Sequence, residues 1–251
     1  MSKVTAVIIA KNEEEMIEGC LQSLSFCDAI VVIDNNSTDD TALIARKKGA
    51  KVVPADTKDF SELRKIGIEK VKTTYIFYVD ADERVSTELA QEILHVIAGN
   101  NSSIGCYRIN RQNYYLGKNP WPKIEQLERL FRTKMLRGWN GKLHETPEYS
   151  GDTQDLVNLL LHYTHRNLST MLVKTNEWSE IEAQNRVKAE HPPIYWWRFP
   201  RVMLQAFLNS YVQQQGFKAG TMGLIESTYQ AFSIFVTYAK LWEQQEKSKK
   251  S

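Results

Sequence analysis

The stretch from Thr74 to Val85 reads TYIFYVDADERV and decides the fold. Its apolar run from Tyr75 to Val79 predicts a buried strand, and Asp80 and Asp82 follow directly. Side chains two residues apart point the same way in an extended chain, so we expect the two aspartates side by side. Such carboxylates suit Mg2+ or Mn2+, which needs only one or two of them when it also holds phosphates. The alternative is a solvated turn before a helix capped at Ser86.

Composition bounds the class of protein. The chain has 251 residues, 42% of them apolar, with 32 basic and 30 acidic residues and a net charge of +2. This length fits one sizeable domain with an appendage, and the balanced charge predicts no nucleic-acid partner. The apolar run that ends before Lys11 is too short for a signal peptide. No apolar segment is long enough to span a membrane. Cys20, Cys27 and Cys106 show no metal or disulfide spacing, which favours a reducing cytoplasm.

Strand-like and helix-like segments alternate over the first hundred residues. Continuous apolar strands between amphipathic helices predict an α/β fold whose sheet is mostly parallel and covered on both faces. Strands are predicted at 4–10, 29–33, 51–53 and 75–79, and helices at 13–25, 41–48 and 60–71.

Polar residues follow the predicted strands at their carboxyl ends, where open α/β sheets bind ligands. Asn12 and Glu13 follow Ala10 after the first strand, Asp34 ends the second, and Asp80 ends the fourth. No glycine-rich phosphate loop is present, which argues against a dinucleotide enzyme or a P-loop ATPase. A metal ion on Asp82 is therefore the candidate for holding phosphate.

Four segments together resemble the inverting family 2 glycosyltransferases of GT-A fold. They are VIIAKNE at 7–13, VVIDNNSTD at 31–39, FSELR at 60–64 and DADER at 80–84. More narrowly, DADER followed by GKLHE at 141–145 resembles the small bacterial glucosyltransferases of lipopolysaccharide inner-core assembly. The resemblance covers essentially the whole chain, is strong in the nucleotide half and weaker beyond Thr146.

The resemblance implies a Rossmann-like GT-A domain at 1–165, a C-terminal helical region at 166–251, a UDP-sugar donor, and Mg2+ or Mn2+. It places Asp34 at the nucleotide, Asp80 near the ribose and the metal, and Asp82 on the metal in an Asp-x-Asp motif. Arg64 would contact the nucleotide or phosphate, or else be a solvated helix arginine. The nucleotide-binding positions are then Ala10, Asn12, Glu13, Asp34, Arg64, Asp80 and Ala81.

Glu145 is the candidate catalytic base. Pro147 follows it closely, which predicts a loop or strand end rather than a helix interior. Inverting sugar transfer needs a carboxylate that accepts the proton of the acceptor hydroxyl. Glu145 resembles in position the acid on the acceptor side of related enzymes; the alternative is a salt-bridged surface glutamate.

A histidine is the candidate for a third metal ligand. His162 follows the apolar run 156–161 and is placed as a strand-end ligand, or else as a hydrogen-bonded structural histidine. His144 is an alternative ligand, and His165 with Arg166 could contact diphosphate. The sequence leaves these choices open.

The C-terminal third reads as helices at 169–190 and 224–242, followed by a charged tail at 243–251 that we expect to fray. The segment 194–218 has no acidic residue, three basic residues and seven aromatic residues. It fits either a surface lying in a lipid headgroup layer or a helix packed on the catalytic domain.

Together these features predict a cytoplasmic, metal-dependent inverting transferase, peripheral on the inner membrane. It would move a hexose, glucose from UDP-glucose by resemblance, onto a heptose of the lipopolysaccharide inner core. Another acceptor, such as a peptide or a polysaccharide precursor, is the alternative within enzymes. A catalytically silent sugar-nucleotide-binding protein is the alternative outside them.

Overall fold

The computed structural model describes residues 3–117, 119–141 and 145–250 and divides into two compact units. Unit 1 comprises Met1–Gln112 and Glu125–His162, and unit 2 comprises Asn113–Ile124 and Tyr163–Ser251. This division differs from the expected boundary after residue 165 by placing 113–124 in unit 2. There the short strand β7 (Asn119–Pro120) pairs with the end of β6 (Ile104–Tyr115).

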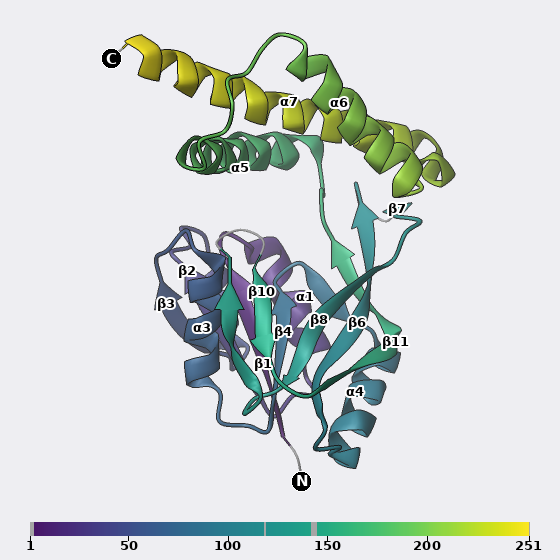
Figure 1. Ribbon diagram of the computed structural model, residues 1–251. Coiled ribbons are helices and arrows are strands. Elements are labelled where there is room, and N and C mark those ends of the chain that lie inside the picture. Colours follow the sequence, from purple (N-terminus) through teal and green to yellow (C-terminus); the bar gives the residue numbers. More distant parts are fainter. Residues whose placement is uncertain (1–2, 118, 142–144, 251) are drawn as a thin grey trace. The chain divides into compact units, whose positions relative to one another are not determined.

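A mixed β-sheet forms the centre of unit 1 (Figure 1). Strands β3, β2, β1 and β4 are parallel neighbours, and β8, β6, β11 and β5 continue the sheet in that order. The expected α/β fold is confirmed, and an antiparallel extension is added beyond β4. The other bounds are β1 Val4–Ala10, β2 Ala29–Asn35, β3 Lys51–Ala55, β4 Tyr75–Asp80, β5 Glu83–Val85, β8 Glu125–Arg132 and β11 Asp152–Tyr163.

Both faces of the sheet are covered, which explains why its central strands are apolar throughout. On β4, Tyr75, Phe77 and Val79 join the core beneath α1, α2 and α4, while Ile76 and Tyr78 join the core beneath α3 and the β9–β10 hairpin. This is the alternation expected of an extended strand. The covering elements are α1 Glu14–Ser23, α2 Thr41–Lys47, α3 Phe60–Lys70, α4 Thr87–Gly99, β9 Leu136–Asn140 and β10 Thr146–Tyr149.

Side-chain caps fix where the two helices nearest the acidic motif begin. The Asp59 carboxylate accepts hydrogen bonds from the backbone N–H groups of Ser61 and Glu62 at the start of α3. The Ser86 hydroxyl accepts one from the N–H of Leu89 at the start of α4, as the sequence predicts. The helix cap at Ser86 is therefore present, and it does not exclude a further role for Asp80 and Asp82.

Unit 2 is built on one long helix. Helix α5 (Leu168–Lys188) and helix α6 (Arg198–Leu208) both pack on α7 (Gly220–Lys250), as Figure 1 shows. Helix α6 continues as a π-helical turn at Asn209–Gln213, and a 3-10 turn at Gly216–Ala219 precedes α7.

The expectation of a frayed tail after residue 242 is wrong, because α7 continues to Lys250. Lys247 pairs with Glu243 one turn earlier at 2.7 Å. The Gln244 side-chain amide donates to Glu180 of α5 at 2.9 Å, and the Gln245 side-chain oxygen accepts from the N–H of Ile194 at 3.0 Å. These contacts tie the last turns of α7 to the rest of unit 2.

Two composition-based expectations can be compared with the structure. Cys20, Cys27 and Cys106 are free thiols in the structure. Within the described ranges, no helix is both long and apolar enough to cross a bilayer.

Candidate functional site

The register of the parallel strands brings the strand-end residues to one edge of the sheet. Ala10 of β1 is opposite Asp34 of β2, and Ile9 of β1 is opposite Asp80 of β4. Asp34 and Asp80 therefore lie at the same carboxyl edge with a single strand between them. This is the edge at which open α/β sheets bind ligands.

Asn12 and Glu13 hold the loop that follows β2. The N–H of Asn12 donates to the Ser37 hydroxyl at 3.0 Å, and the Asn12 side-chain oxygen accepts from the N–H of Thr38 at 2.8 Å. The N–H of Glu13 donates to the Thr41 hydroxyl at 2.8 Å. Asn12 has a φ of 54°, a left-handed conformation that asparagine tolerates better than most residues. The two residues thus shape the rim of the strand-end edge through backbone and amide contacts.

Asp34 presents a buried acceptor at this edge. Its side chain lies at the end of β2, and its Oδ1 atom receives no hydrogen bond from the described part of the chain. Buried polar atoms in folded proteins are nearly always hydrogen-bonded. Asp34 is therefore chemically suited to accept an N–H group from a bound molecule.

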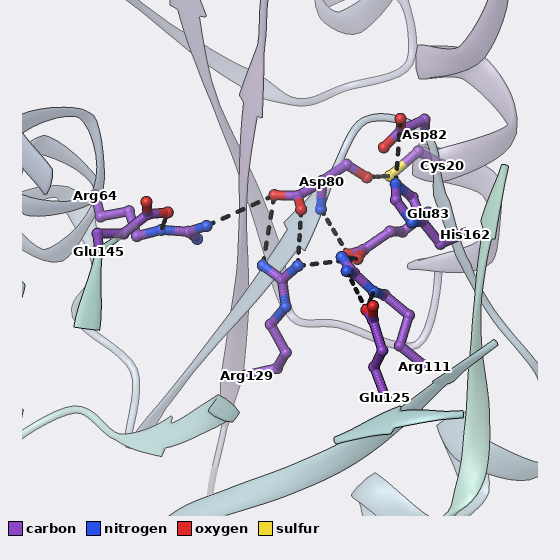
Figure 2. A network of polar contacts seen from close by, with 10 residues as sticks. All are labelled: Cys20, Arg64, Asp80, Asp82, Glu83, Arg111, Glu125, Arg129, Glu145 and His162. Atoms are coloured by element: carbon purple, nitrogen blue, oxygen red, sulfur yellow. Dashed lines mark hydrogen bonds and ion pairs between the residues drawn. The ribbon is translucent and has the colours of Figure 1, made fainter. Parts of the chain in front are cut away.

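Asp80 is held by a buried network of charges (Figure 2). Arg129 Nη2 donates to Asp80 Oδ2 at 2.7 Å and to Glu83 Oε1 at 2.9 Å. Glu83 is fully buried, accepts the N–H of Asp80 at 2.9 Å, and also pairs with Arg111 at 3.2 Å. Burial opposes ionisation of Asp80, but the charges of Arg129 and Arg64 outweigh it and hold the pKa of Asp80 well below its ordinary value. Asp80 is therefore an ionised carboxylate that is paired with Arg129 and lies near Arg64.

The expectation that Asp80 and Asp82 lie side by side is wrong. Strand β4 ends at Asp80, and the chain turns through Ala81 and Asp82 before it re-enters the sheet as β5. The rule for residues two apart holds only in extended backbone. Asp82 consequently points to His162, whose Nε2 lies 3.4 Å from Asp82 Oδ2 (Figure 2).

His162 reaches Asp82 because of sheet pairing. It lies in β11 opposite Glu83 of β5, so the antiparallel register places it beside the turn. Burial alone would lower the pKa of His162, but the hydrogen bond and charge of Asp82 outweigh burial and raise it.

Asp82 and His162 fit a partial metal-binding site. Together they offer a carboxylate oxygen and an imidazole nitrogen, and a divalent cation that also holds phosphates needs few protein ligands. Among the residues that the structure describes, no group of three or more His, Cys, Asp or Glu side chains is arranged to hold a metal ion. Asp80 does not complete such a group, because its carboxylate is paired with Arg129.

Arg64 and Glu145 form a second pair beside Asp80. Arg64 Nε donates to Glu145 Oε1 at 2.7 Å, and Arg64 Nη2 lies 3.8 Å from Asp80 Oδ1. The guanidinium lies against the rings of Tyr78 and Trp139, with centroid distances of 5.2 and 4.6 Å. Arg64 is buried, so the alternative of a solvated helix arginine is wrong. Contact with two rings and a carboxylate fixes its orientation.

Glu145 lies in the loop immediately before β10 and not inside a helix, in line with the expectation of a loop or strand end. Its side chain is only 11% exposed, so it is salt-bridged but is not a surface glutamate. A carboxylate at the rim of a hairpin, fixed by one arginine, is placed to accept a proton from a neighbouring hydroxyl.

The two other histidine candidates are His165 and His144. His165 belongs to unit 2, where its Nδ1 lies 3.0 Å from the buried carboxylate of Glu226. His144 lies outside the described residues.

Sequence reasoning missed Glu83, Arg111 and Arg129 as parts of the site. Arg129 is 49 residues from Asp80 along the chain and meets it only because β8 pairs with β4. One signal was present: Arg129 directly precedes the apolar residues Leu130 and Phe131, and charged residues are rarely buried unless they are paired.

The chain is similar in sequence to known glycosyltransferases. The family model described as Glycosyl transferase family 2 matches residues 5–152. An uncharacterized glycosyltransferase of Rickettsia typhi is 28% identical, with 99% of this chain and 90% of that protein covered. The lipopolysaccharide core biosynthesis glycosyltransferase LpsC of Rhizobium meliloti is 25% identical, with 96% and 92% covered.

Among solved structures, the chain is similar to glucosyl-3-phosphoglycerate synthase from Mycobacterium tuberculosis. The match has 23% identity and a TM-score of 0.37, and it covers 45% of this chain and 44% of that one. A likeness of this extent carries no functional weight. The family match spans more than half of the chain, including every strand of the parallel part of the sheet, and the chain therefore belongs to glycosyl transferase family 2.

Proposed function

We propose that the protein transfers a hexose from a nucleotide-sugar donor, with inversion at the sugar carbon, to a hydroxyl of the lipopolysaccharide inner core. The donor we propose is UDP-glucose and the acceptor sugar a heptose. The observation that carries the proposal is the Arg64–Glu145 pair beside Asp80, at the carboxyl edge of the sheet. The Rhizobium meliloti relative is named a lipopolysaccharide core biosynthesis glycosyltransferase, which supports the choice of a lipopolysaccharide acceptor.

The donor would occupy the strand-end edge of unit 1. Asp34 would accept the ring N–H of uracil with its buried oxygen, which would satisfy an acceptor that no described side chain or backbone group satisfies. Asp80 would face the ribose, and Ala10, Asn12, Glu13 and Ala81 would form the surrounding wall. Arg129 and Glu83 act here as positioning residues, because they fix the carboxylate and the backbone of Asp80.

Transfer would proceed as a single displacement. The acceptor oxygen forms a bond to the anomeric carbon, its proton passes to a carboxylate oxygen of Glu145, and the bond from that carbon to the diphosphate oxygen breaks. The diphosphate leaves with the electron pair, and attack from the opposite face inverts the configuration. Arg64 keeps Glu145 oriented by its 2.7 Å hydrogen bond.

A divalent cation, Mg2+ or Mn2+, would be held by Asp82 and His162. When bound, it would neutralise the negative charge that develops on the departing diphosphate. This assignment rests on the approach of these two side chains to 3.4 Å and on their donor chemistry.

The chain would divide the work between the two domains expected from the sequence. Residues 1–165 would form the donor-binding and catalytic domain, and residues 166–251 would contact the acceptor or the cytoplasmic surface of the inner membrane. The protein would then work in the cytoplasm as a peripheral membrane enzyme.

The variant Glu145→Gln tests the assignment of the base. Because glutamine keeps the shape of the side chain but cannot take the proton, we expect transfer to fall by about 10²- to 10⁴-fold. Affinity for UDP, measured by calorimetry, should stay unchanged. Glu148→Gln is the matched control, since Glu148 lies on the same hairpin and bonds to Asn140. A fully active Glu145→Gln enzyme would remove Glu145 from the mechanism.

An acceptor screen separates the alternatives. Truncated lipopolysaccharide cores, peptides and polysaccharide precursors would each be incubated with several UDP-hexoses, with and without EDTA. Transfer to a truncated core that EDTA abolishes supports the proposal. Transfer to a peptide or another precursor only would overturn the acceptor, and UDP-sugar binding with no transfer at all would favour a silent binding protein.

A further inference from the structure

Helix α6 has one face packed and the other exposed. Phe199 and Val202 pack against a buried cluster that includes Tyr238 and Leu241 of α7, and the Phe199 and Phe235 rings approach to 5.7 Å between centroids. No residue of α6 itself is fully buried. The packing partner that the structure shows for α6 is α7 of the same unit, and the expectation that this segment lies in a lipid headgroup layer stays a prediction.

Exposed apolar side chains recur on one side of α6 and of the π-helical turn that follows it. Leu204, Leu208 and Val212 follow one another four residues apart, and Trp197 and Arg201 precede them at helical spacing. Trp196, next to Trp197, is 81% exposed, and Leu204 is 59% exposed. Single exposed apolar residues are normal, but a contiguous set of this kind marks an interaction surface. The α6 face is defined here as Trp196, Trp197, Arg201, Leu204, Leu208 and Val212.

The stretch of chain that carries the α6 face has charge of one sign only. No Asp or Glu occurs between Glu190 and Glu226. Two basic side chains lie over exposed rings: Arg198 at the start of α6 and Lys218 in the 3-10 turn before α7. The Arg198 guanidinium is 5.5 Å from the ring centroid of Trp197, and the Lys218 ammonium is 5.9 Å from that of Phe217. An aromatic ring beside a cation is the pairing favoured at the boundary between acyl chains and headgroups.

Charge complementarity selects the partner. A second copy would pair two faces that are both basic and without acids, which electrostatics disfavours. An anionic lipid surface would take the leucine and valine side chains into the acyl boundary, the tryptophans at headgroup level and the basic residues at the phosphates. We propose that the α6 face docks the protein, with α6 lying in the interface plane, on the surface of an anionic lipid bilayer. The inference deepens the membrane contact proposed above for residues 166–251 by naming the face that makes it, and it does not require sugar transfer.

Vesicle co-sedimentation of the full chain tests this docking. We expect binding to phosphatidylcholine vesicles that contain phosphatidylglycerol, no binding to phosphatidylcholine alone, and weaker binding as salt is raised. Leu204→Glu with Leu208→Glu should abolish binding. Arg198→Gln with Arg201→Gln should weaken it roughly 30-fold, about fivefold for each basic residue.

A matched pair on unit 1 controls for added charge and lost apolar area. Leu43 and Leu94 are exposed leucines on α2 and α4, and replacing both with Glu should leave vesicle binding unchanged. Circular dichroism would verify that both double variants are folded. The changed positions are exposed, so a loss of structure is not expected.

Three outcomes would overturn the inference: no binding of the wild-type chain to anionic vesicles, equal loss in the Leu43 and Leu94 control, or full binding after the Leu204 and Leu208 changes. A concentration-dependent dimer that disappears with Leu204→Glu and Leu208→Glu would assign the face to a second copy and likewise overturn it. Glu145→Gln should bind vesicles normally, and the Leu204 and Leu208 variant should bind UDP normally. Failure of docking and failure of the proposed activity are therefore distinguishable.

Discussion

Replacing Arg129 with Met should destabilise unit 1 strongly. Arg129 donates to Asp80 at 2.7 Å and to Glu83 at 2.9 Å, and Glu83 is fully buried. Removing one partner of a buried ion pair costs about 3–5 kcal/mol because a charge stays behind unpaired. We expect the lower part of this range, since Glu83 keeps Arg111 and the Asp80 side chain is 32% exposed.

Hydrogen exchange of the β4 amides measures this loss locally, without assuming that both units unfold together. A loss of about 3–5 kcal/mol corresponds to exchange roughly two to nearly four orders of magnitude faster. Arg108→Met is the control, because Arg108 makes two hydrogen bonds to Asp155 on the surface, where such pairs contribute little. Exchange in Arg129→Met no faster than in Arg108→Met would refute the reasoning.

The difference between wild type and Arg129→Met should also depend on pH. The folded-state pKa of Asp80 is held below the value of about 3.9 for an unfolded aspartate. The unfolded state therefore binds the proton first, so the stability that Asp80 contributes is complete above about pH 4 and is lost as the pH falls further. As the pH falls below about 4, the exchange rates of wild type and Arg129→Met should become more similar. A growing difference between the two rates would contradict the lowered pKa of Asp80.

Two further predictions concern the helix next to the motif and the metal. Gly19→Ala should destabilise the protein by about 1–3 kcal/mol in a thermal melt. The added Cβ would lie 2.7 Å from Nε of Arg84, which is itself anchored on the Met16 carbonyl at 2.6 Å. Gly99→Ala in α4 meets no atom within 4 Å and should be neutral or slightly stabilising; equal effects would contradict the packing argument. Asp82→Asn and His162→Ala should each weaken Mn2+ binding in the presence of UDP at least tenfold by calorimetry, and unchanged binding in both would exclude this pair as ligands.

The order of strands and helices in unit 1 could be read from the sequence because it depends on local patterns. Apolar runs, helical spacing and cap residues are properties of neighbouring positions, and they located β1, β2, β4 and the helices between them. The same patterns located Asp34 and Asp80 at the strand ends and Glu145 outside a helix.

The sequence could not tell which charges meet. Arg129 and Asp80 are 49 residues apart, and Arg64 and Glu145 are 81 residues apart. Their contacts depend on the antiparallel pairing of β8 with β4 and on the packing of β9 against α3. Spacing along the chain was also misleading at Asp82, where a turn replaces the extended backbone that the rule assumes.

The sequence by itself determined the α/β pattern, the family and the composition of the α6 segment, because each follows from residue type and order. Only the tertiary structure decided that Asp80 pairs with buried arginines and that Asp82 contacts His162. It also decided which face of α6 stays exposed. Long-range ion pairs and exposed faces arise when distant segments are brought together, and their energies depend on burial that no local pattern encodes.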